Sequence, residues 1–377
     1  MFKEYSEKNH TELSALTIIQ GGGTVKREDS DRNLMYDTSN LSNYKMVRKD
    51  DFIVHLRSFE GGLEKSSLDG IISPAYHTFH SDMADSRFYY PYFRSYEFIK
   101  HKLVSHVYGI RDGRSIDIDG MKTIEIPYTS IEEQRKIGDY LDCLEHLITL
   151  HQRKCEQTKN LKKYMLQKMF PQNGAKVPEI RFNGFTHDWE QRKLIDYLEV
   201  SSEKNRDNRF TKEDVLSVSG EYGIVNQIEF QGRSFAGASV SNYGVVENGD
   251  VVYTKSPLKS NPYGIIKTNK GIPGIVSTLY AVYKPKEITD SKFVQIYFEL
   301  DSRMNSYMHP LVNKGAKNDM KVSAENALKG MVSFPKKDEQ EMISLYFSTL
   351  DNLITLHQRQ CDELKKMKKY MLQNMFI

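Results

Sequence analysis

Cationic and amide side chains in four loop segments are the residues best suited to recognise a ligand. Arginine and lysine can each donate hydrogen bonds to guanine, and asparagine can bond to adenine, while either cation can also neutralise phosphate. The chemistry that they suggest is nucleic-acid recognition, with solvation of ordinary surface loops as the alternative. These residues are Arg57, Arg111, Arg114, Lys255, Lys259, Lys317 and Asn318.

Patterns for catalysis are incomplete in this sequence. Asp250 with Lys255 could belong to the acid, acid and lysine set of a metal nuclease, but the second acid is missing from the same predicted strand. Asn261-Pro262-Tyr263 lacks the second proline of the loop used by amino-methyltransferases. A phosphate-binding lysine loop, a nucleophile elbow and a His-Glu-x-x-His motif are absent from the sequence. We therefore expect no catalytic residue and no cofactor.

Metal and disulfide chemistry are not expected either. His151 and His357 stand at equivalent places, but no third ligand follows at the spacing that a zinc site needs, so we interpret them as helix-packing residues. The three cysteines, Cys143, Cys155 and Cys361, form no Cys-x-x-Cys pair. We expect Cys155 and Cys361 to be small core residues in a chain of the reducing cytoplasm.

The elements that must hold these loops occur twice. Residues 147–153 return as 353–359 and residues 162–167 return as 368–373, both at an offset of 206 (353 − 147 and 368 − 162). This period is far longer than a solenoid repeat. It indicates a duplicated domain plus helix with pseudo-two-fold symmetry, and duplex DNA is a common partner for such symmetry.

A heptad pattern predicts a long helix at the end of each repeat. Apolar or small residues recur at steps of four and three, which is typical of a helix–helix seam. We predict helices over 131–169 and 337–375, packed antiparallel as a coiled coil, with Pro127 and Pro335 ahead of them and Pro171 after the first. The seam residues are Ile137, Leu141, Leu144, Ile148, His151, Cys155 and Thr158, and then Ile343, Phe347, Leu350, Ile354, His357, Cys361 and Leu364.

The remaining segments predict mixed α/β (α+β) domains. Residues 250–254 and 278–283 are β-branched and aromatic runs typical of strands, and residues 89–98 and 293–299 resemble short aromatic helices. The fold class is therefore two α/β recognition domains, each followed by one long helix. The expected boundaries are 1–127 for the first domain, 128–170 for the first helical region, 171–188 for a linker, 189–335 for the second domain and 336–377 for the second helical region.

Bulk composition agrees with two domains of ordinary polarity. The chain has 377 residues, 39% of them hydrophobic, and a net charge of only +3, which argues against a simple cationic coat protein. The sequence contains no apolar run of membrane-spanning length, and Met1-Phe2-Lys3-Glu4 does not resemble a signal peptide. We expect a cytoplasmic chain that makes no membrane contact.

These motifs resemble one family. Glu133-Gln134, residues 147–153 and residues 161–170 are similar to the conserved regions of specificity subunits of type I restriction–modification systems. The segments 178–182 and 189–194 are similar too. The resemblance implies two target-recognition domains that each read one half of a split DNA sequence, with the two helices spacing the halves.

The same resemblance implies the partners. A specificity subunit is not catalytic; it binds double-stranded DNA and recruits two methyltransferase subunits and restriction subunits. Outward helix positions are repeated as faithfully as the seam, which predicts that they bind the methyltransferase subunits. These positions are Gln152, Arg153, Gln358 and Arg359.

One departure from the family pattern leaves a second interpretation open. A segment like Trp189–Leu194 is expected ahead of each recognition domain, but only the second domain has it, and about ten residues equivalent to 189–198 are missing before the first. The chain is therefore either the DNA-reading subunit or an interaction scaffold that binds methyltransferase subunits without reading DNA.

Overall fold

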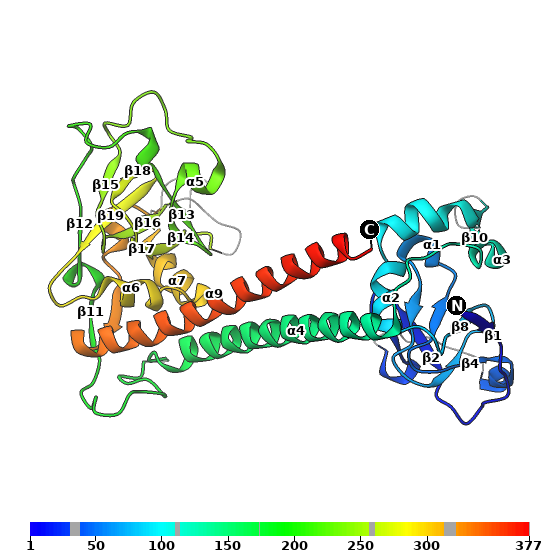
Figure 1. Cartoon of the computed structure of the whole chain (residues 1–377). Helices are drawn as coiled ribbons and strands as arrows, with labels where there is room; N and C mark the ends of the chain where they lie inside the picture. The colour runs from blue at the N-terminus through cyan, green and yellow to red at the C-terminus, as the bar shows by residue number, and fades with distance from the viewer. Residues whose placement is uncertain (31–37, 110–113, 173, 256–260, 313–321, 377) are drawn as a thin grey trace. The chain divides into compact units, whose positions relative to one another are not determined.

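The computed structural model describes residues 1–30, 38–109, 114–172, 174–255, 261–312 and 322–376 (Figure 1). The chain divides into two compact units. Unit 1 comprises Met1–Arg153 and Gln358–Ile377, and unit 2 comprises Lys154–His357. Among the described residues, no helix is both long enough and apolar enough to cross a membrane.

Unit 1 is built on a four-stranded antiparallel sheet in the order β1-β8-β5-β6. Its central strand β5 is buried along its whole length, because Phe52, Ile53 and Val54 lie between the aromatic core and the smaller strand pairs. The four strands are β1 (Lys3–Tyr5), β8 (His77–His80), β5 (Phe52–Val54) and β6 (Glu64–Lys65). The paired strands are β2 (Leu16–Ile19) with β3 (Gly23–Lys26), β4 (Lys45–Val47) with β7 (Gly70–Ile72), and β9 (Val107–Tyr108) with β10 (Ser115–Ile116).

Unit 1 has three short α-helices among its described residues, of which α2 is rich in aromatic residues. They are α1 (Ser58–Gly61), α2 (Ser86–Phe93) and α3 (Ile118–Met121). The helix expected over 89–98 is wrong in its bounds: α2 begins earlier and ends at Phe93, and a separate π-helical turn covers Phe98–Lys102. The π-helical turn begins as a separate segment because the Ser95 hydroxyl accepts a hydrogen bond from the Phe98 amide at its first residue.

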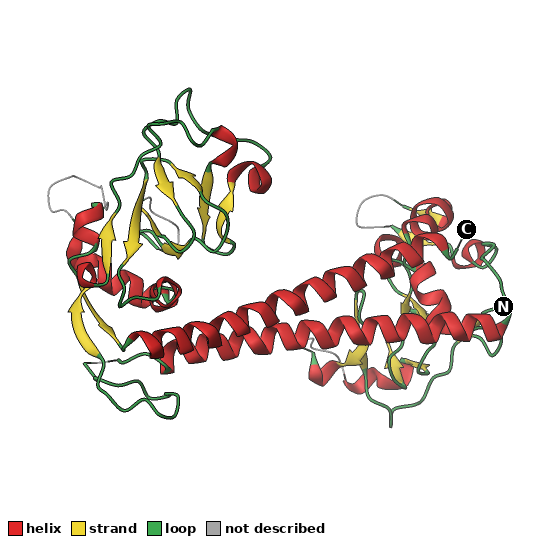
Figure 2. Cartoon of the chain, turned by 60° about the vertical axis from the view of Figure 1, so that its left-hand side comes forward, coloured by secondary structure: helices red, strands yellow, loops and turns green. Residues whose placement is uncertain are grey.

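Unit 2 repeats the four-stranded sheet and two of the strand pairs of unit 1 (strands are yellow in Figure 2). Its four-stranded sheet has the order β12-β19-β16-β17, and β13-β14 and β15-β18 correspond to β2-β3 and β4-β7. An additional pair, β11 with β20, belongs to unit 2. The strands are β12 (Leu198–Val200), β19 (Tyr280–Pro285), β16 (Val251–Thr254), β17 (Ile266–Thr268), β13 (Leu216–Ser219), β14 (Gly223–Asn226), β15 (Gly244–Val246), β18 (Gly274–Val276), β11 (Glu190–Lys193) and β20 (Met331–Phe334).

The helices of unit 2 cover the core beside this sheet. The strands expected at 250–254 and 278–283 are confirmed as β16 and β19, and the helix expected at 293–299 is confirmed as α6 with bounds two residues earlier. The helices are α5 (Gln227–Gln231), α6 (Ser291–Tyr297), α7 (Asp301–Met308) and α8 (Ala324–Ala327).

A long helix follows each domain, as predicted. The first is α4 (Ile131–Lys168) and the second is α9 (Lys337–Asn374), each ending one residue before its expected bound. In unit 1 the hydroxyl of Tyr140 lies 3.3 Å from the Met367 sulfur, and Lys368 pairs with Glu145.

In unit 2 the same two helices meet again through equivalent residues. Lys162 Nζ lies 2.6 Å from Asp351 Oδ1, and the Cys155 thiol lies 3.9 Å from the Ile354 carbonyl. The pairs Lys162–Asp351 and Lys368–Glu145 are related by the 206-residue offset (368 − 162 and 351 − 145). The repeat therefore includes a cross-helix ion pair that is present twice.

Buried glutamines join each domain to its long helix. Gln134 and Gln340 are both fully buried. The side-chain oxygen of Gln134 accepts from the Asp85 amide at 3.0 Å, and that of Gln340 accepts from the Asp290 amide at 2.9 Å. Asp85 and Asp290 cap the N-termini of α2 and α6. The repeated glutamine thus fixes the start of the domain helix against the base of the long helix.

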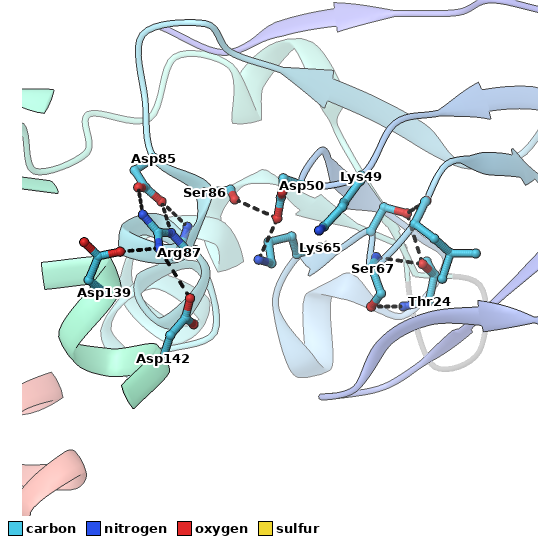
Figure 3. Close-up of polar contacts among 12 residues, drawn as sticks. Thr24, Lys49, Asp50, Lys65, Ser67, Asp85, Ser86, Arg87, Asp139 and Asp142 are labelled. Carbon is cyan, nitrogen blue, oxygen red and sulfur yellow. Dashed lines mark hydrogen bonds and ion pairs between the residues drawn. The ribbon is translucent and has the colours of Figure 1, made fainter. Parts of the chain in front are cut away.

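Arg87 fastens α2 to α4 in unit 1. Its guanidinium lies 2.6 Å from Asp85, 2.5 Å from Asp139 and 3.5 Å from Asp142, so it links the cap of α2 to two carboxylates of α4 (Figure 3). A β-carbon at Gly138 would lie 3.1 Å from the Arg87 β-carbon. The close approach of Arg87 explains why α4 carries a glycine at this position.

Candidate DNA-recognition and partner-binding residues

The structure brings Arg57 and Arg114 to the same short helix. Arg57 directly precedes α1 and is exposed. The guanidinium of Arg114 lies 4.4 Å from the centroid of the Phe59 ring and 3.2 Å from Glu60 Oε1. The loops around residues 57 and 114 therefore lie side by side at α1, next to β10 (Figure 1). Arg111 lies outside the described residues.

Contacts at the end of β5 shape the Arg57 loop. The buried Ser58 hydroxyl accepts from the His55 amide at 2.9 Å, and His55 Nδ1 accepts from the Arg57 amide at 3.3 Å. Burial lowers the pKa of His55, so its ring is neutral at pH 7. The Arg57 backbone is thus held by local hydrogen bonds, while its side chain points to the surface.

The ion pair of Arg114 with Glu60 is a surface contact that a ligand could replace. The side chain of Arg114 is 42% exposed and that of Glu60 is 46% exposed. Ion pairs with this exposure contribute about 0–1 kcal/mol. The stacking on Phe59 orients the guanidinium without enclosing it.

In unit 2, Lys255 directly follows β16. Its ammonium group donates to the Thr278 carbonyl at 2.9 Å, and its amide donates to the Leu279 carbonyl at 3.2 Å. Where the described chain resumes, Asn261 donates to Asp301 at 2.7 Å. Lys259, Lys317 and Asn318 lie outside the described residues.

Arg57 and Lys255 occupy comparable places in the repeat. Strands β5 and β16 hold the same position in their sheets, each between the partner of the first strand and the last strand. A candidate cation follows each of these strands within three residues. In both units, therefore, a basic side chain follows the same strand of the four-stranded sheet, although the surrounding loop sequences differ.

The four candidate partner-binding residues are exposed on the long helices. Gln152 and Arg153 lie on α4, and Gln358 and Arg359 lie on α9, with the Gln358 amide 3.2 Å from Asp362. The seam cysteines that follow these pairs are buried: Cys155 is 5% exposed and Cys361 is 2% exposed. The arrangement leaves the repeated outward side chains accessible to another subunit.

A buried carboxylate in unit 1 is a feature that the sequence patterns did not identify. Glu64 is fully buried and accepts from the amides of Gly21 and Gly23 at 2.7 and 3.3 Å and from the Tyr90 hydroxyl at 2.7 Å. It also pairs with Arg94. The glycines, with φ of 81° and 73°, form the turn between β2 and β3, so their positive φ lets two amides point at one carboxylate.

Unit 2 carries the opposite charges at the matching positions. In the sheet registers, Glu64 pairs with Ile53 on β5, and Lys267 pairs with Val252 on β16. Lys267 is 9% exposed, and its burial lowers its pKa while the nearby Glu299 opposes that shift. Arg94 and Glu299 follow α2 and α6 respectively. The acid–base pair is therefore inverted between the units.

Glu299 also connects this pair to α4. Lys162 Nζ lies 2.5 Å from Glu299 and 2.6 Å from Asp351. Burial alone would lower the pKa of Lys162, but these two carboxylates raise it, so the ammonium form is held. Lys162 is thus a structural cation between the domain and both long helices.

Comparison with known proteins supports the family resemblance. No family model matches the chain. A curated relative, the putative type I restriction enzyme MjaX specificity subunit of Methanocaldococcus jannaschii, is 24% identical over 280 residues. The match covers 68% of this chain and 59% of that relative, so this chain spans only part of its length.

A solved structure has the same fold. The S subunit of a type I restriction-modification system from M. genitalium aligns over 100% of this chain and 96% of its own, with a TM-score of 0.55 and 14% identity. The HsdS subunit from Thermoanaerobacter tengcongensis aligns over 100% of this chain and 90% of its own, with a TM-score of 0.47 and 18% identity. The resemblance seen in the repeated motifs is confirmed: this chain is similar in sequence to a type I restriction enzyme specificity subunit and has the fold of a type I S subunit.

Proposed function

We propose that this chain is the sequence-specific DNA-binding specificity subunit of a type I restriction–modification enzyme. Each recognition domain reads one half of a bipartite DNA site. The observation that carries the proposal is the repeated sheet with a cation after the same strand in both units, Arg57 after β5 and Lys255 after β16. Two domains that share a four-stranded sheet but have unlike loops suit two half-sites of unlike sequence.

The long helices act as the spacer between the half-sites. We propose that 1–127 and 189–335 are the recognition domains, with 171–188 as linker, and that the helical regions 128–170 and 336–377 form an antiparallel coiled coil. The cross-helix pairs Lys368–Glu145 and Lys162–Asp351 and the buried residues Leu144 and Leu350 support this pairing. A rigid spacer would fix the distance between the two sequences that are read.

The chemistry belongs to partner subunits. We propose that the chain is non-catalytic, acts in the cytoplasm, and recruits two methyltransferase subunits and restriction subunits to DNA. Gln152, Arg153, Gln358 and Arg359 bind the methyltransferase subunits through their exposed side chains. With a net charge of only +3, the chain leaves part of the phosphate contact to those partners.

Exchanging residues 200–335 for the same region of a related subunit is the central test. The exchange should change one half of the methylated sequence and leave the other half unchanged, because the other domain and both helices remain. Methylome sequencing of a host that carries the hybrid with its methyltransferase subunits measures the result. A change in both halves would mean that the two domains are not independent readers. If the unmodified chain with its methyltransferase subunits shows no preference for any DNA sequence, the scaffold function is favoured instead.

Alanine at the candidate contacts should separate base readers from phosphate contacts. A base-reading Arg57, Arg114 or Lys255 changed to alanine should cost about 1–3 kcal/mol at one base position and relax specificity there. A phosphate contact should weaken binding to every sequence and flatten the salt slope by about one. Binding to half-site variants over a salt series distinguishes the two, with the exposed Arg135 of α4 as control. The same series covers Arg111, Lys259, Lys317 and Asn318. If none of the seven variants alters affinity or preference, the assignment of these loops is wrong.

Reversing the charge at both Arg153 and Arg359 should weaken methyltransferase binding while the fold is kept. Both side chains are exposed, so the change removes two cations from the surface and leaves the seam intact. The matched control is Lys154→Glu with Lys366→Glu, which changes the net charge equally at exposed helix positions that the repeat does not preserve. Co-purification at moderate salt gives the readout. If both double variants retain the methyltransferase subunits equally, Arg153 and Arg359 do not belong to the interface.

A further inference from the structure

In unit 1, three carboxylates bind the start of α2. The Ser86 hydroxyl donates to Asp50 at 3.4 Å (Figure 3). The Arg87 guanidinium lies 2.5 Å from Asp139 and 3.5 Å from Asp142. One of these carboxylates belongs to the loop before β5 and the other two belong to α4. They therefore join the recognition domain of unit 1 to its long helix.

The two donors recur in unit 2 as Ser291 and Lys292. They are the first two residues of α6, just as Ser86 and Arg87 are the first two residues of α2. Ser291 is 9% exposed, yet within the described part of the chain neither its hydroxyl nor the Lys292 ammonium group has a hydrogen-bond or ion-pair partner. Buried hydroxyls are normally hydrogen-bonded, so the Ser291 hydroxyl is available to a ligand.

The three carboxylates have no counterpart in unit 2. Asp50 and Gly249 each lie two residues before the strand β5 or β16, and both have a positive φ, of 71° and 89°. A glycine thus replaces the acceptor of the serine. On the long helices the 206-residue offset relates each acid of α4 to an uncharged residue of α9. These pairs are Asp139 with Leu345 and Asp142 with Ser348 (345 − 139 and 348 − 142).

A cavity of about 220 Å³ lies among these residues in unit 2. Its lining includes both donors, Ser291 and Lys292, and two of the replaced positions, Gly249 and Ser348. A single water needs only about 10–15 Å³ of such volume, so the cavity has room for a larger polar ligand. Unit 2 therefore has an open space where unit 1 has its own carboxylates.

The charges around this cavity favour an anion. Lys270 also lines it and is exposed, and among the described residues its ammonium group has no carboxylate partner. The acid in the lining, Asp351, is already paired with Lys162, with 2.6 Å between Nζ and Oδ1. The cavity therefore carries the charges of Lys270 and Lys292 without a carboxylate to balance them.

The cavity is separate from the candidate DNA contact of unit 2. Gly249 lies two residues before β16, whereas Lys255 directly follows it. A strand of four residues spans about 13 Å, at ~3.3 Å per residue. A phosphate of DNA held at Lys255 is thus at the other end of the strand, and a free anion fits the cavity better.

We propose that this cavity binds a free phosphate group, as inorganic phosphate or as a small phosphomonoester. The Lys270 and Lys292 ammonium groups neutralise its charge, and the hydroxyls of Ser291 and Ser348 donate to its oxygens. Because Ser291 belongs to α6 and Ser348 to α9, the bound anion joins the domain of unit 2 to its long helix. It takes the part that the carboxylates bound to Arg87 have in unit 1. This inference does not depend on the proposed DNA recognition.

Binding of inorganic phosphate to the full chain, without DNA, tests the proposal. Isothermal titration calorimetry at pH 7.5 and constant ionic strength measures the affinity, and the fluorescence of Trp189 in the core of unit 2 follows thermal unfolding. We expect saturable binding and a higher unfolding temperature in phosphate than in chloride. Lys270→Ala with Lys292→Ala should bind phosphate about tenfold or more weakly, because two charged donors are lost.

Two further variants separate the cavity from general effects of salt. Lys212→Ala with Lys336→Ala removes the same charge from exposed positions of unit 2 outside the cavity, so it should keep the affinity of the unmodified chain. Ser348→Asp restores the carboxylate that unit 1 has at Asp142. It should abolish phosphate binding and raise the unfolding temperature in chloride.

Three results would overturn the proposal. The first is the absence of saturable phosphate binding, and the second is equal affinity in the two double lysine variants. The third is displacement of phosphate by a short DNA duplex that carries no terminal phosphate, since this would assign the cavity to the DNA backbone. Glycerol 3-phosphate should compete with inorganic phosphate, because the phosphate group is what the cavity binds.

Discussion

Leu144→Asp or Leu350→Asp is expected to lower the free energy of unfolding by at least ~3 kcal/mol. Leu144 is 3% exposed on α4 and Leu350 is 5% exposed on α9, both on the heptad seam. Removing a buried leucine costs about 2–5 kcal/mol, and an unpaired carboxylate in its place adds a desolvation cost. Urea unfolding followed by circular dichroism measures the loss.

The same substitution at an exposed position of the same helix is the control. Leu345 lies on α9 and is 65% exposed, so Leu345→Asp should change stability by about 0.5 kcal/mol or less. If Leu144→Asp and Leu345→Asp were equally mild, the heptad positions would not form a packed seam.

Glu339→Ala should destabilise unit 2 by about 3 kcal/mol, because it removes the buried carboxylate that pairs with the partly buried Arg181. The side chain of Glu339 is 3% exposed and that of Arg181 is 15% exposed, and the indole nitrogen of Trp189 loses its acceptor as well. Trp189 is the only tryptophan of the chain, so its fluorescence reports the unfolding of this region directly.

The repeat supplies a matched control for this prediction. Glu133→Ala removes the same residue type from the same position of the other repeat, where the side chain is exposed. Its effect on stability should stay within about 0.5 kcal/mol. Two alanine variants of equal stability would show that the Arg181 and Trp189 contacts contribute little.

The long helices were the most predictable elements, because their signal is periodic and local. Seam residues recur every three or four positions from Ile137 to Thr158 and from Ile343 to Leu364, and prolines lie before both helices. The strands at 250–254 and 278–283 were predictable from their runs of β-branched and aromatic residues. The prediction of one helix over the aromatic stretch 89–98 was wrong in its bounds. The Ser95 hydroxyl accepts a hydrogen bond from the Phe98 amide, and the stretch is divided into two helical segments.

The candidate site was less predictable, because it depends on contacts between distant residues. The sequence does not place Arg114 beside Phe59 and Glu60, which lie more than fifty residues earlier. Nor does it reveal that Glu64 is a buried acceptor, since a charged residue in a short strand usually faces water. Such features follow from topology, which local patterns constrain only weakly.

The inverted acid–base pair limits how these domains can recombine in evolution. Unit 1 joins Glu64 of β6 to Arg94 after α2, and unit 2 places Lys267 of β17 near Glu299 after α6. A crossover between the sheet of one copy and the following helix of the other would bring two carboxylates together, or two cations, in a buried place. A hybrid that keeps opposite charges at this buried place therefore inherits the sheet and the helix that follows it from one parent.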